Sequence, residues 1–391
     1  MFEVNITDCH KQLSETLNPY ISGMNFNQYT KLVIRKGQFA RPQRNRNYAD
    51  VVLKYNTKRF LSSSSSEFGV PNEISIPVPW GKIAGKQWGN EKGQPILAVH
   101  GYLDNAASMD GIIPLLPLSD YNVVAIDLPG HGFSSHYAPG MTYRLSDAIV
   151  ALRRVQIHFG WGKSTIIAHS MGAAIAAWFA STFPEHVDRL AMIDLINVGP
   201  TPLQKQVKAT RKSLEKNIEL NDKLINTSEP PAYTFLDACG RAFLANQFLH
   251  GTDSITRSSV EKIMSRGLRK VGVNKEGEDL FTWTTDFRLR IPSPFTVVFE
   301  QVEHYAERIQ CPMLVIKASD SPWYMSEEHA ERILKIYSNN NPNYQFKKVE
   351  GGHHVHLNEP EKVSPLINKF LKKKFKDSGT EDKEQVPVDL F

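Results

Sequence analysis

Long hydrophobic runs, disulfide-type cysteine spacing and cofactor-binding patterns are all absent from this sequence of 391 residues. No run of 18 or more apolar residues occurs, so no transmembrane helix is predicted. The three cysteines, Cys9, Cys239 and Cys311, are scattered and lack metal-ligand spacing, which is typical of reduced thiols inside a cell. No pattern for a zinc, calcium, nucleotide or flavin site is present, so we predict no cofactor and no metal.

The net charge is +5, but an excess of positive charge is found in only one segment. Residues 24–61 carry nine Lys and Arg against the single acid Asp50, so this segment contributes +8 and the remainder −3. This stretch and the serines at 62–66 resemble a mitochondrial presequence, with Arg59-Phe60-Leu61 similar to a processing site. Acids before residue 24 argue against import and leave a solvated arm of a cytoplasmic or peroxisomal protein as the alternative. The basic stretch offers no interleaved stacking aromatics within a folded site, so no nucleic-acid partner is predicted.

Short, continuous apolar runs recur along the chain, with helix-prone sequence between several of them. The runs lie at 95–99, 122–126, 164–167, 190–193 and 313–316. Such runs are typical of parallel strands covered on both faces, and their alternation with helices indicates a doubly wound α/β sheet. Two alternating segments, 73–78 and 81–88, predict an antiparallel hairpin ahead of this sheet.

The alternation of strands and helices is interrupted once, which defines the expected domains. Polar, helix-prone sequence replaces it between two core strands, and we interpret this insertion as a helical cap over the site. The expected regions are a disordered basic leader and linker at 1–70, the first part of the core at 71–197, the helical cap at 198–310, the second part of the core at 311–375 and a disordered tail at 376–391.

Ala168-His169-Ser170-Met171-Gly172 lies where one of these apolar runs ends and a helix is predicted to begin. A small-x-Ser-x-Gly sequence at a strand–helix junction is the pattern of a nucleophile elbow, in which the serine occupies a strained turn and projects its hydroxyl from the sheet. Alanine stands where the first glycine is usual, which is a mild departure. The pattern predicts Ser170 as a nucleophile.

A serine nucleophile requires a base, and in this fold the histidine follows the last strand. The loop at 351–360, Gly-Gly-His-His-Val-His-Leu-Asn-Glu-Pro, occupies that position, and its two glycines permit a tight turn. We assign His353 as the general base, with His354 and His356 as competitors. Neither a carboxylate nor a cysteine with matching spacing accompanies the three histidines, so they do not indicate a metal site.

Oxyanion donors are expected from two backbone positions. His100-Gly101-Tyr102 follows the run at 95–99, and Gly101 permits the sharp turn that would present the N–H of Tyr102. The second donor would be the N–H of Met171. Gly130-His131-Gly132, one strand later, is interpreted as a structural loop near the pocket.

The acid that would orient the histidine has two candidates. Asp320 follows the run at 313–316, where this fold commonly keeps its acid, but the loop lacks the usual Gly-x-x-Asp pattern and is about one residue short. Asp194 follows the run at 190–193, a position that some proteins of this fold use, although a carboxylate there is also common as a turn cap. The fold alone favours Asp320 and leaves both open.

Three longer segments resemble a known family. HGYLDNAAS at 100–108 is similar to an HGWLDNASS signature, GHGFSSHYAPG at 130–140 to a GHGLSSHYSPG segment, and the loop at 353–360 to an NHxVHMxEP pattern. These are features of the serine hydrolase-like (kraken-like) protein family of the α/β-hydrolase superfamily. The resemblance implies the α/β-hydrolase fold, hydrolase activity and Ser170 as nucleophile, but no particular substrate. Asp194 matches the family and the loop with Asp320 does not, so the two acids become equal candidates.

The sequence leaves two hypotheses for the function of the protein. The first is a serine hydrolase that cleaves an ester, thioester or related acyl bond of a small molecule through an acyl-enzyme. The second is a ligand-binding protein that keeps the fold with little turnover, which the undecided acid and Ala168 leave open. An epoxide hydrolase or dehalogenase is disfavoured, because those enzymes attack with a carboxylate and position 170 is a serine. The sequence predicts neither the substrate nor the oligomeric state.

Overall fold

A computed structural model describes residues 69–226 and 230–375 of the chain. Nearly all of the predicted leader and the whole of the predicted tail therefore lie outside the described residues. Within the described part, no helix combines the length and the apolar character needed to cross a membrane.

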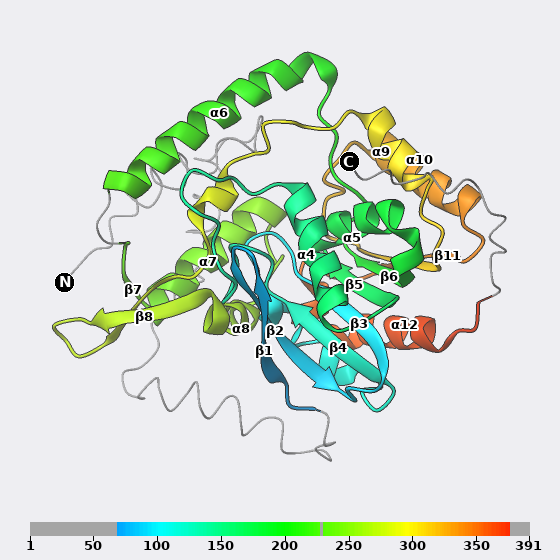
Figure 1. Cartoon of the computed structure of the whole chain (residues 1–391), viewed down its shortest axis with the longest axis horizontal. Coiled ribbons are helices and arrows are strands. Elements are labelled where there is room, and N and C mark those ends of the chain that lie inside the picture. The colour runs from blue at the N-terminus through cyan, green and yellow to red at the C-terminus, as the bar shows by residue number, and fades with distance from the viewer. Residues whose placement is uncertain (1–68, 227–229, 376–391) are drawn as a thin grey trace.

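An eight-stranded sheet forms the centre of the molecule (Figure 1), in the order β1-β2-β4-β3-β5-β6-β10-β11. Its strands are β1 (Asn72–Val78), β2 (Gly81–Gly89), β3 (Gln94–Val99), β4 (Tyr121–Ile126), β5 (Ser164–His169), β6 (Val187–Ile193), β10 (Met313–Ala318) and β11 (Tyr344–Val349). β2 is antiparallel to both of its neighbours, β1 and β4, whereas all later neighbours are parallel. The mostly parallel, doubly wound sheet predicted from the sequence is confirmed.

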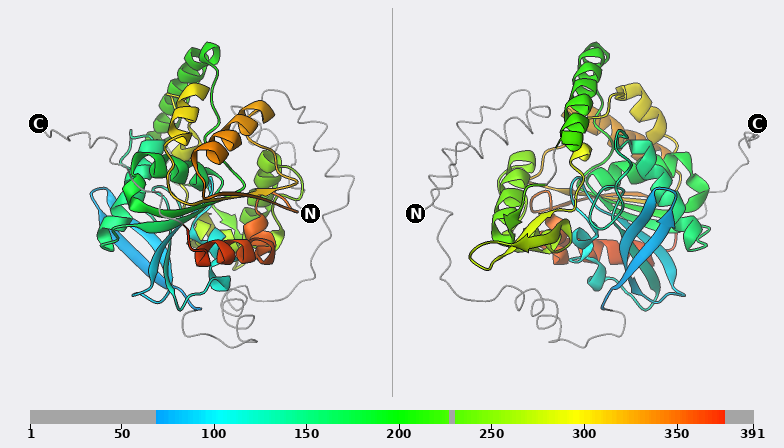
Figure 2. Two further views of the ribbon diagram at one scale, coloured as in Figure 1. Left: turned by 90° about the vertical axis from the view of Figure 1, so that its right-hand side faces the viewer. Right: turned by 60° about the vertical axis from the view of Figure 1, so that its left-hand side comes forward.

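The inner strands are apolar throughout because helices cover both faces of the sheet. In β3, Leu97 and Val99 pack into one layer, whereas Ile96 and Ala98 pack into the other. The first layer contains α4 (Leu145–His158), α5 (Met171–Thr182), α9 (Phe299–Ala306) and α10 (Glu327–Asn340), and the second contains η2 (Ala106–Met109), η3 (Ile113–Leu115) and α12 (Pro360–Lys372). Figure 2 shows the red α12 across the sheet from the yellow α9 and the orange α10.

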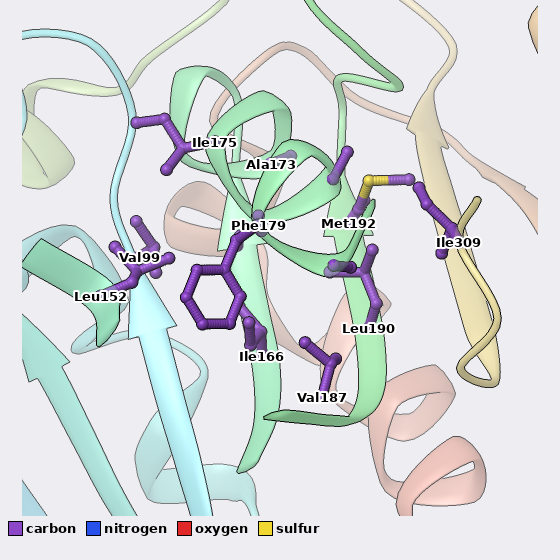
Figure 3. Packing of buried hydrophobic residues seen from close by; sticks show 14 of the residues in the cluster. Val99, Leu152, Ile166, Ala173, Ile175, Phe179, Val187, Leu190, Met192 and Ile309 are labelled. Atoms are coloured by element: carbon purple, nitrogen blue, oxygen red, sulfur yellow. The ribbon is translucent and has the colours of Figure 1, made fainter. Parts of the chain in front are cut away.

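Phe179 illustrates how the first layer is packed. It projects from α5 and is fully buried, and Figure 3 shows its ring among the side chains of Val99, Leu152 and Ile166. Burying a side chain of this size contributes about 1.5–3 kcal/mol relative to leaving it exposed. Contacts of this kind hold α5, and with it the start of the helix at Met171, in a fixed place above the ends of the strands.

The insertion between β6 and β10 is not purely helical, which corrects the predicted helical cap. It contains α6 (Leu203–Asn226), α7 (Phe235–His250), α8 (Arg257–Gly267) and η5 (Phe287–Arg290), together with a three-stranded sheet of β7 (Tyr233–Thr234), β8 (Leu268–Val273) and β9 (Asp279–Trp283). α8 ends at Gly267, where the chain turns into β8. Two consecutive charged residues, Arg269 and Lys270, interrupt β8, so this strand lacks the apolar run that marks the inner strands of the core.

The end of the insertion also differs from the prediction. α9 packs against α5 and α10 of the first layer, so it belongs to the core although it falls inside the predicted range 198–310. Figure 1 shows α6 as a long helix at the edge of the molecule, away from the central sheet.

A buried ion-pair network joins the insertion to the core. The Arg266 guanidinium, at the end of α8, donates to both oxygens of Asp127 at 2.8 and 2.9 Å and to Glu73 on β1 at 2.7 Å. A second link runs from the Asn105 amide, which donates to the carbonyl of Ile263 at 2.9 Å. These contacts place α8 beside the loop that follows β3.

Candidate active site

Ser170 occupies a strained turn between β5 and α5. Its φ of 52° and ψ of −125° lie in a region that residues with a side chain rarely adopt. The small residue at position 172 is required by close packing, because a Cβ on Gly172 would lie 2.5 Å from the carbonyl oxygen of His100 and 2.6 Å from that of Val99. The structure therefore has the local geometry that the small-x-Ser-x-Gly pattern predicted, and Ala168 is accommodated in the core at this junction.

His353 reaches Ser170 from the loop after β11. The Nε2 atom of His353 lies 2.8 Å from the Ser170 Oγ, and the histidine is only 1% exposed. Two glycines shape this loop: Gly351 has a φ of 134°, and a Cβ on Gly352 would lie 2.7 Å from the carbonyl oxygen of Asp253 in the insertion. His353, rather than its neighbours in the loop, contacts the serine hydroxyl.

Asp194 lies directly after β6, and its carboxylate joins the same array. Its Oδ2 is 2.6 Å from the Nδ1 of His353, so one imidazole links the carboxylate to the serine. The second oxygen, Oδ1, accepts hydrogen bonds from the Lys317 Nζ at 2.6 Å and from the Ala318 amide at 3.0 Å. Both carboxylate oxygens thus have partners, and the side chain of Asp194 is buried.

Asp320, the other predicted acid, is not brought to His353. Its side chain is exposed and accepts a hydrogen bond from the hydroxyl of Ser319 at 2.7 Å. The short loop after β10 is the reason, because it turns the next residue, Ser321, inward instead, with its Oγ 3.5 Å from the Nδ1 of His353. The space that an acid from this loop would fill is occupied by the Lys317 ammonium, which also donates to the carbonyl of Ser321 at 2.8 Å.

Burial sets the protonation of the array. It raises the pKa of Asp194 to about 6, although the Lys317 ammonium acts in the opposite direction. Burial also lowers the pKa of Lys317 and holds that of His353 well below its ordinary value, where the neighbouring histidines add to the effect. At pH 7 the imidazole is therefore neutral and Asp194 is largely ionised, which leaves the lone pair of Nε2 directed at the serine hydroxyl.

Residues of the insertion contact His353 and His354, and the sequence did not single these residues out. The ring of His250, at the end of α7, stacks on His353 with 4.1 Å between centroids, and its Nδ1 lies 2.8 Å from the hydroxyl of Tyr324. The carbonyl of Ser254 accepts a hydrogen bond from the amide of His354 at 3.0 Å. Lys317, His250 and Tyr324 lie in no recognisable motif, so only the fold identifies them as neighbours of the site.

The loop after β3 passes directly against Ser170. A Cβ on Gly101 would lie 3.2 Å from the Cβ of Ser170, so the next residue, Tyr102, follows at the edge of the site. Met171, the other predicted donor position, is the first residue of α5. The motif at 130–132 packs against the loop after β3, because the ring of His131 lies 4.9 Å from the ring of His100.

The remaining two predicted histidines lie on the far side of His353. His356 lies against His169, with 3.9 Å between ring centroids, and His354 places its Nε2 3.4 Å from the Oδ2 of Asp104. All four side chains are buried. Sequence reasoning found no carboxylate for these histidines, whereas the fold provides Asp104 from the loop after β3.

Comparisons with known proteins agree with this architecture. Residues 94–261 match the family described as alpha/beta hydrolase fold. A serine hydrolase-like protein of Danio rerio is 32% identical over 82% of this chain and 92% of its own length. A probable serine hydrolase of Drosophila melanogaster is 34% identical over 77% of this chain and 87% of its own. The crystal structure of a hypothetical protein from Pseudomonas aeruginosa PAO1 has a TM-score of 0.64 and 27% identity, covering 77% of this chain and 99% of that one.

Proposed function

The chain belongs to the serine hydrolase-like family of the α/β-hydrolase superfamily and is a hydrolase of that fold, and we propose that it cleaves a carboxylic ester, thioester or related acyl bond through an acyl-enzyme at Ser170. The observation that carries this proposal is the continuous array from serine through imidazole to carboxylate, with contacts of 2.8 and 2.6 Å. A serine hydroxyl is a weak nucleophile by itself, and this array is the arrangement that activates it.

In the proposed reaction, each proton has a defined path. The Asp194 carboxylate accepts the Nδ1–H of His353, so the Nε2 lone pair takes the proton as the Ser170 Oγ attacks the acyl carbon. The imidazolium then returns that proton to the leaving oxygen or sulfur as the bond to the acyl carbon breaks. A water molecule enters, gives a proton to Nε2 and attacks the acyl carbon. The imidazolium then returns that proton to the Ser170 Oγ as the bond between Oγ and the acyl carbon breaks, which releases the acid and restores the serine.

Negative charge on the acyl oxygen requires donors next to Ser170. We assign this role to the backbone N–H groups of Tyr102 and Met171, because the first follows the glycine packed against Ser170 and the second opens α5. The start of a helix is favourable for an anion, because backbone N–H groups and the positive end of the helix dipole meet there. Removing a single such donor from a hydrolase commonly reduces kcat about 10²–10³-fold.

A fluorophosphonate probe tests the assignment of the nucleophile, because it reacts only with an activated serine. We expect the full-length protein to be labelled and the Ser170→Ala variant to remain unlabelled. Ser181→Ala is the matched control: Ser181 is a buried serine on the same helix, and its hydroxyl donates to the carbonyls of Ala177 and Tyr305 at 2.8 and 2.7 Å. Equal labelling of wild type and Ser170→Ala would contradict the assignment.

Turnover of a panel of acyl esters and thioesters tests the reaction itself. The proposal requires that at least one of them be hydrolysed by wild type and by Ser181→Ala but not by Ser170→Ala. A protein that is labelled at Ser170 yet turns over no acyl substrate would instead be a ligand-binding member of the fold, and the proposed reaction would be wrong.

A further inference from the structure

A second group of titratable side chains lies next to Ser170 and takes no part in the proposed reaction. Asp104 comes from the loop after β3, His169 from the end of β5 and His354 from the loop before α11 (Val355–Asn358). One ligand atom from each, Asp104 Oδ2, His169 Nδ1 and His354 Nε2, lies within 4.8 Å of the other two, and all three residues are buried. The Asp104 oxygen is 3.9 Å from the His169 nitrogen and 3.4 Å from the His354 nitrogen.

Two of these atoms have no hydrogen-bond partner among the described residues, namely the Oδ2 of Asp104 and the Nδ1 of His169. The other nitrogen of His169, Nε2, lies 2.9 Å from the carbonyl oxygen of His353. A carbonyl can only accept, so Nε2 carries the hydrogen, and a neutral ring then presents the lone pair of Nδ1 to the carboxylate. Two electron-rich acceptors facing each other in the protein interior are costly unless a cation lies between them.

The protein's own nearby cations are committed elsewhere. The Arg266 guanidinium pairs with Asp127 and Glu73, and the Lys317 ammonium pairs with Asp194. An isolated buried carboxylate costs several kcal/mol, so Asp104 requires a compensating positive charge. That charge is either a proton on one of the two histidines or a bound metal ion.

The arrangement of the three atoms favours a metal ion. They converge beside Gly101, where a Cβ would lie 2.9 Å from the His169 Nδ1 and 3.2 Å from the Asp104 Oδ2. Two imidazole nitrogens and one carboxylate oxygen form a donor set typical of Zn²⁺, whose ligand bonds of about 2.0–2.2 Å place tetrahedral ligands roughly 3.3 Å apart. The 3.4 and 3.9 Å separations are near that spacing, and the two histidine nitrogens, which lie within 4.8 Å of each other, complete the group that would close around the ion.

We propose that Asp104, His169 and His354 form a binding site for a divalent transition-metal ion of the Zn²⁺ type. The ion is held by the Oδ2 of Asp104, the Nδ1 of His169 and the Nε2 of His354. The hydrogen bond from His169 to the carbonyl of His353 fixes the required tautomer, as outer-sphere contacts of metal-bound histidines commonly do. The same contact couples the metal site to the backbone of the proposed general base.

The charge of the Asp104 carboxylate also affects the proposed oxyanion position. A Cβ on Gly101, which would lie 3.2 Å from the Asp104 Oδ2, would also lie 3.2 Å from the Cβ of Ser170, so the cluster and Ser170 pack against the same glycine. An uncompensated Asp104 carboxylate there would repel the negative charge that develops on the acyl oxygen, because charges interact strongly in a region without water. A bound divalent cation reverses the sign of the local charge and removes that repulsion.

Zn²⁺ titration of the chelator-treated, full-length protein by isothermal calorimetry tests this proposal. We expect wild type to bind one equivalent, and Asp104→Asn and His354→Gln each to lose at least about 10-fold in affinity. His136→Gln is the matched control, because the Nδ1 of His136 also lies 3.4 Å from a buried carboxylate, that of Asp286, which is already paired with Arg288. This control variant is expected to bind like wild type.

Two results would overturn the metal site. If wild type binds no Zn²⁺, the cluster holds a proton instead; if Asp104→Asn and His354→Gln both bind as wild type does, the zinc occupies surface histidines. Circular dichroism of each variant guards against loss of folding, and X-ray absorption of the wild-type complex should show two imidazole ligands. The readout is metal binding rather than turnover, so the site stands or falls independently of the proposed esterase reaction.

Discussion

Asp194 and Asp104 are buried carboxylates that approach consecutive histidines of the loop after β11, but their surroundings differ. Asp194 contacts His353, Lys317 and the Ala318 amide, so both of its oxygens have partners. Asp104 approaches the adjacent histidine, His354, and its Oδ2 makes no hydrogen bond of normal geometry within the described part of the chain. Consecutive histidines of one loop therefore serve two different aspartates.

The difference shows what each carboxylate is prepared for. A fully satisfied carboxylate holds its imidazole in one orientation, which a general base requires. Asp104, whose Oδ2 has no hydrogen bond in the part of the chain that the structure describes and faces the lone pair of the His169 Nδ1, is instead suited to bind a cation from solution, as we propose. Three substitutions test how far a buried carboxylate depends on its charge or its cation: two act on Asp194 and one on Asp127, and the largest expected effect comes first.

Asp194→Asn removes the charge of the satisfied carboxylate while keeping its shape. We expect kcat on an acyl ester to fall about 10⁴-fold, because the amide can donate to Nδ1 and favours the wrong imidazole tautomer. Asp320→Asn is the control, since its exposed side chain contacts Ser319 rather than His353. Steady-state kinetics of both variants decide between the two aspartates: a large loss in Asp320→Asn with an active Asp194→Asn would contradict the proposed array.

Arg266→Met removes the cation from a third buried carboxylate, Asp127, and leaves it only the hydrogen bonds from the amides of Ala106 and Phe133. Asp127 is fully buried, and the variant would leave it without its guanidinium partner at the joint between the core and the insertion. Breaking a buried pair in this way typically destabilises a protein by about 3–5 kcal/mol. Chemical denaturation measures this loss of unfolding free energy, and Arg269→Met, at an exposed position of β8, should change it little. An unchanged stability would show that buried carboxylates in this protein tolerate the loss of a cation.

Much of the fold could be predicted from the sequence because its signals are local. Inner strands such as β4, β5 and β10 are buried on both faces, so their runs of apolar residues are visible without any knowledge of their neighbours. The small sheet of the insertion could not be found in the same way. β8 is largely exposed, with charged side chains at Arg269 and Lys270, and its pairing with β9 depends on contacts outside any local window.

In the candidate site, too, residues with a local sequence signal could be predicted and residues without one could not. Ser170 and His353 each lie in a turn whose small residues mark it in the sequence, so their meeting could be predicted. The acid could not, because carboxylates follow both β6 and β10, and only the side-chain directions show that Asp194 approaches His353. The cluster around Asp104 was missed because its members are distant in the sequence and meet only when β3 and β5 pair.

Lys317→Met would remove the cation that pairs with Asp194 and so make this aspartate more like Asp104. The resulting change in the pKa of Asp194 should be visible in the pH profile of kcat/KM. Burial raises the pKa of Asp194 to about 6 and the ammonium restrains this rise, so its loss moves the pKa further upward. Catalysis requires the ionised carboxylate of Asp194 and the neutral imidazole of His353, which titrate as a coupled pair. The acid limb of the kcat/KM profile should therefore shift to higher pH by roughly one unit. Lys347→Met, on the exposed side of β11, is the control and should leave the limb in place. A merely structural role for Lys317 predicts lower activity at every pH with an unshifted limb, and that result would show that the difference between the two aspartates does not lie in their cations.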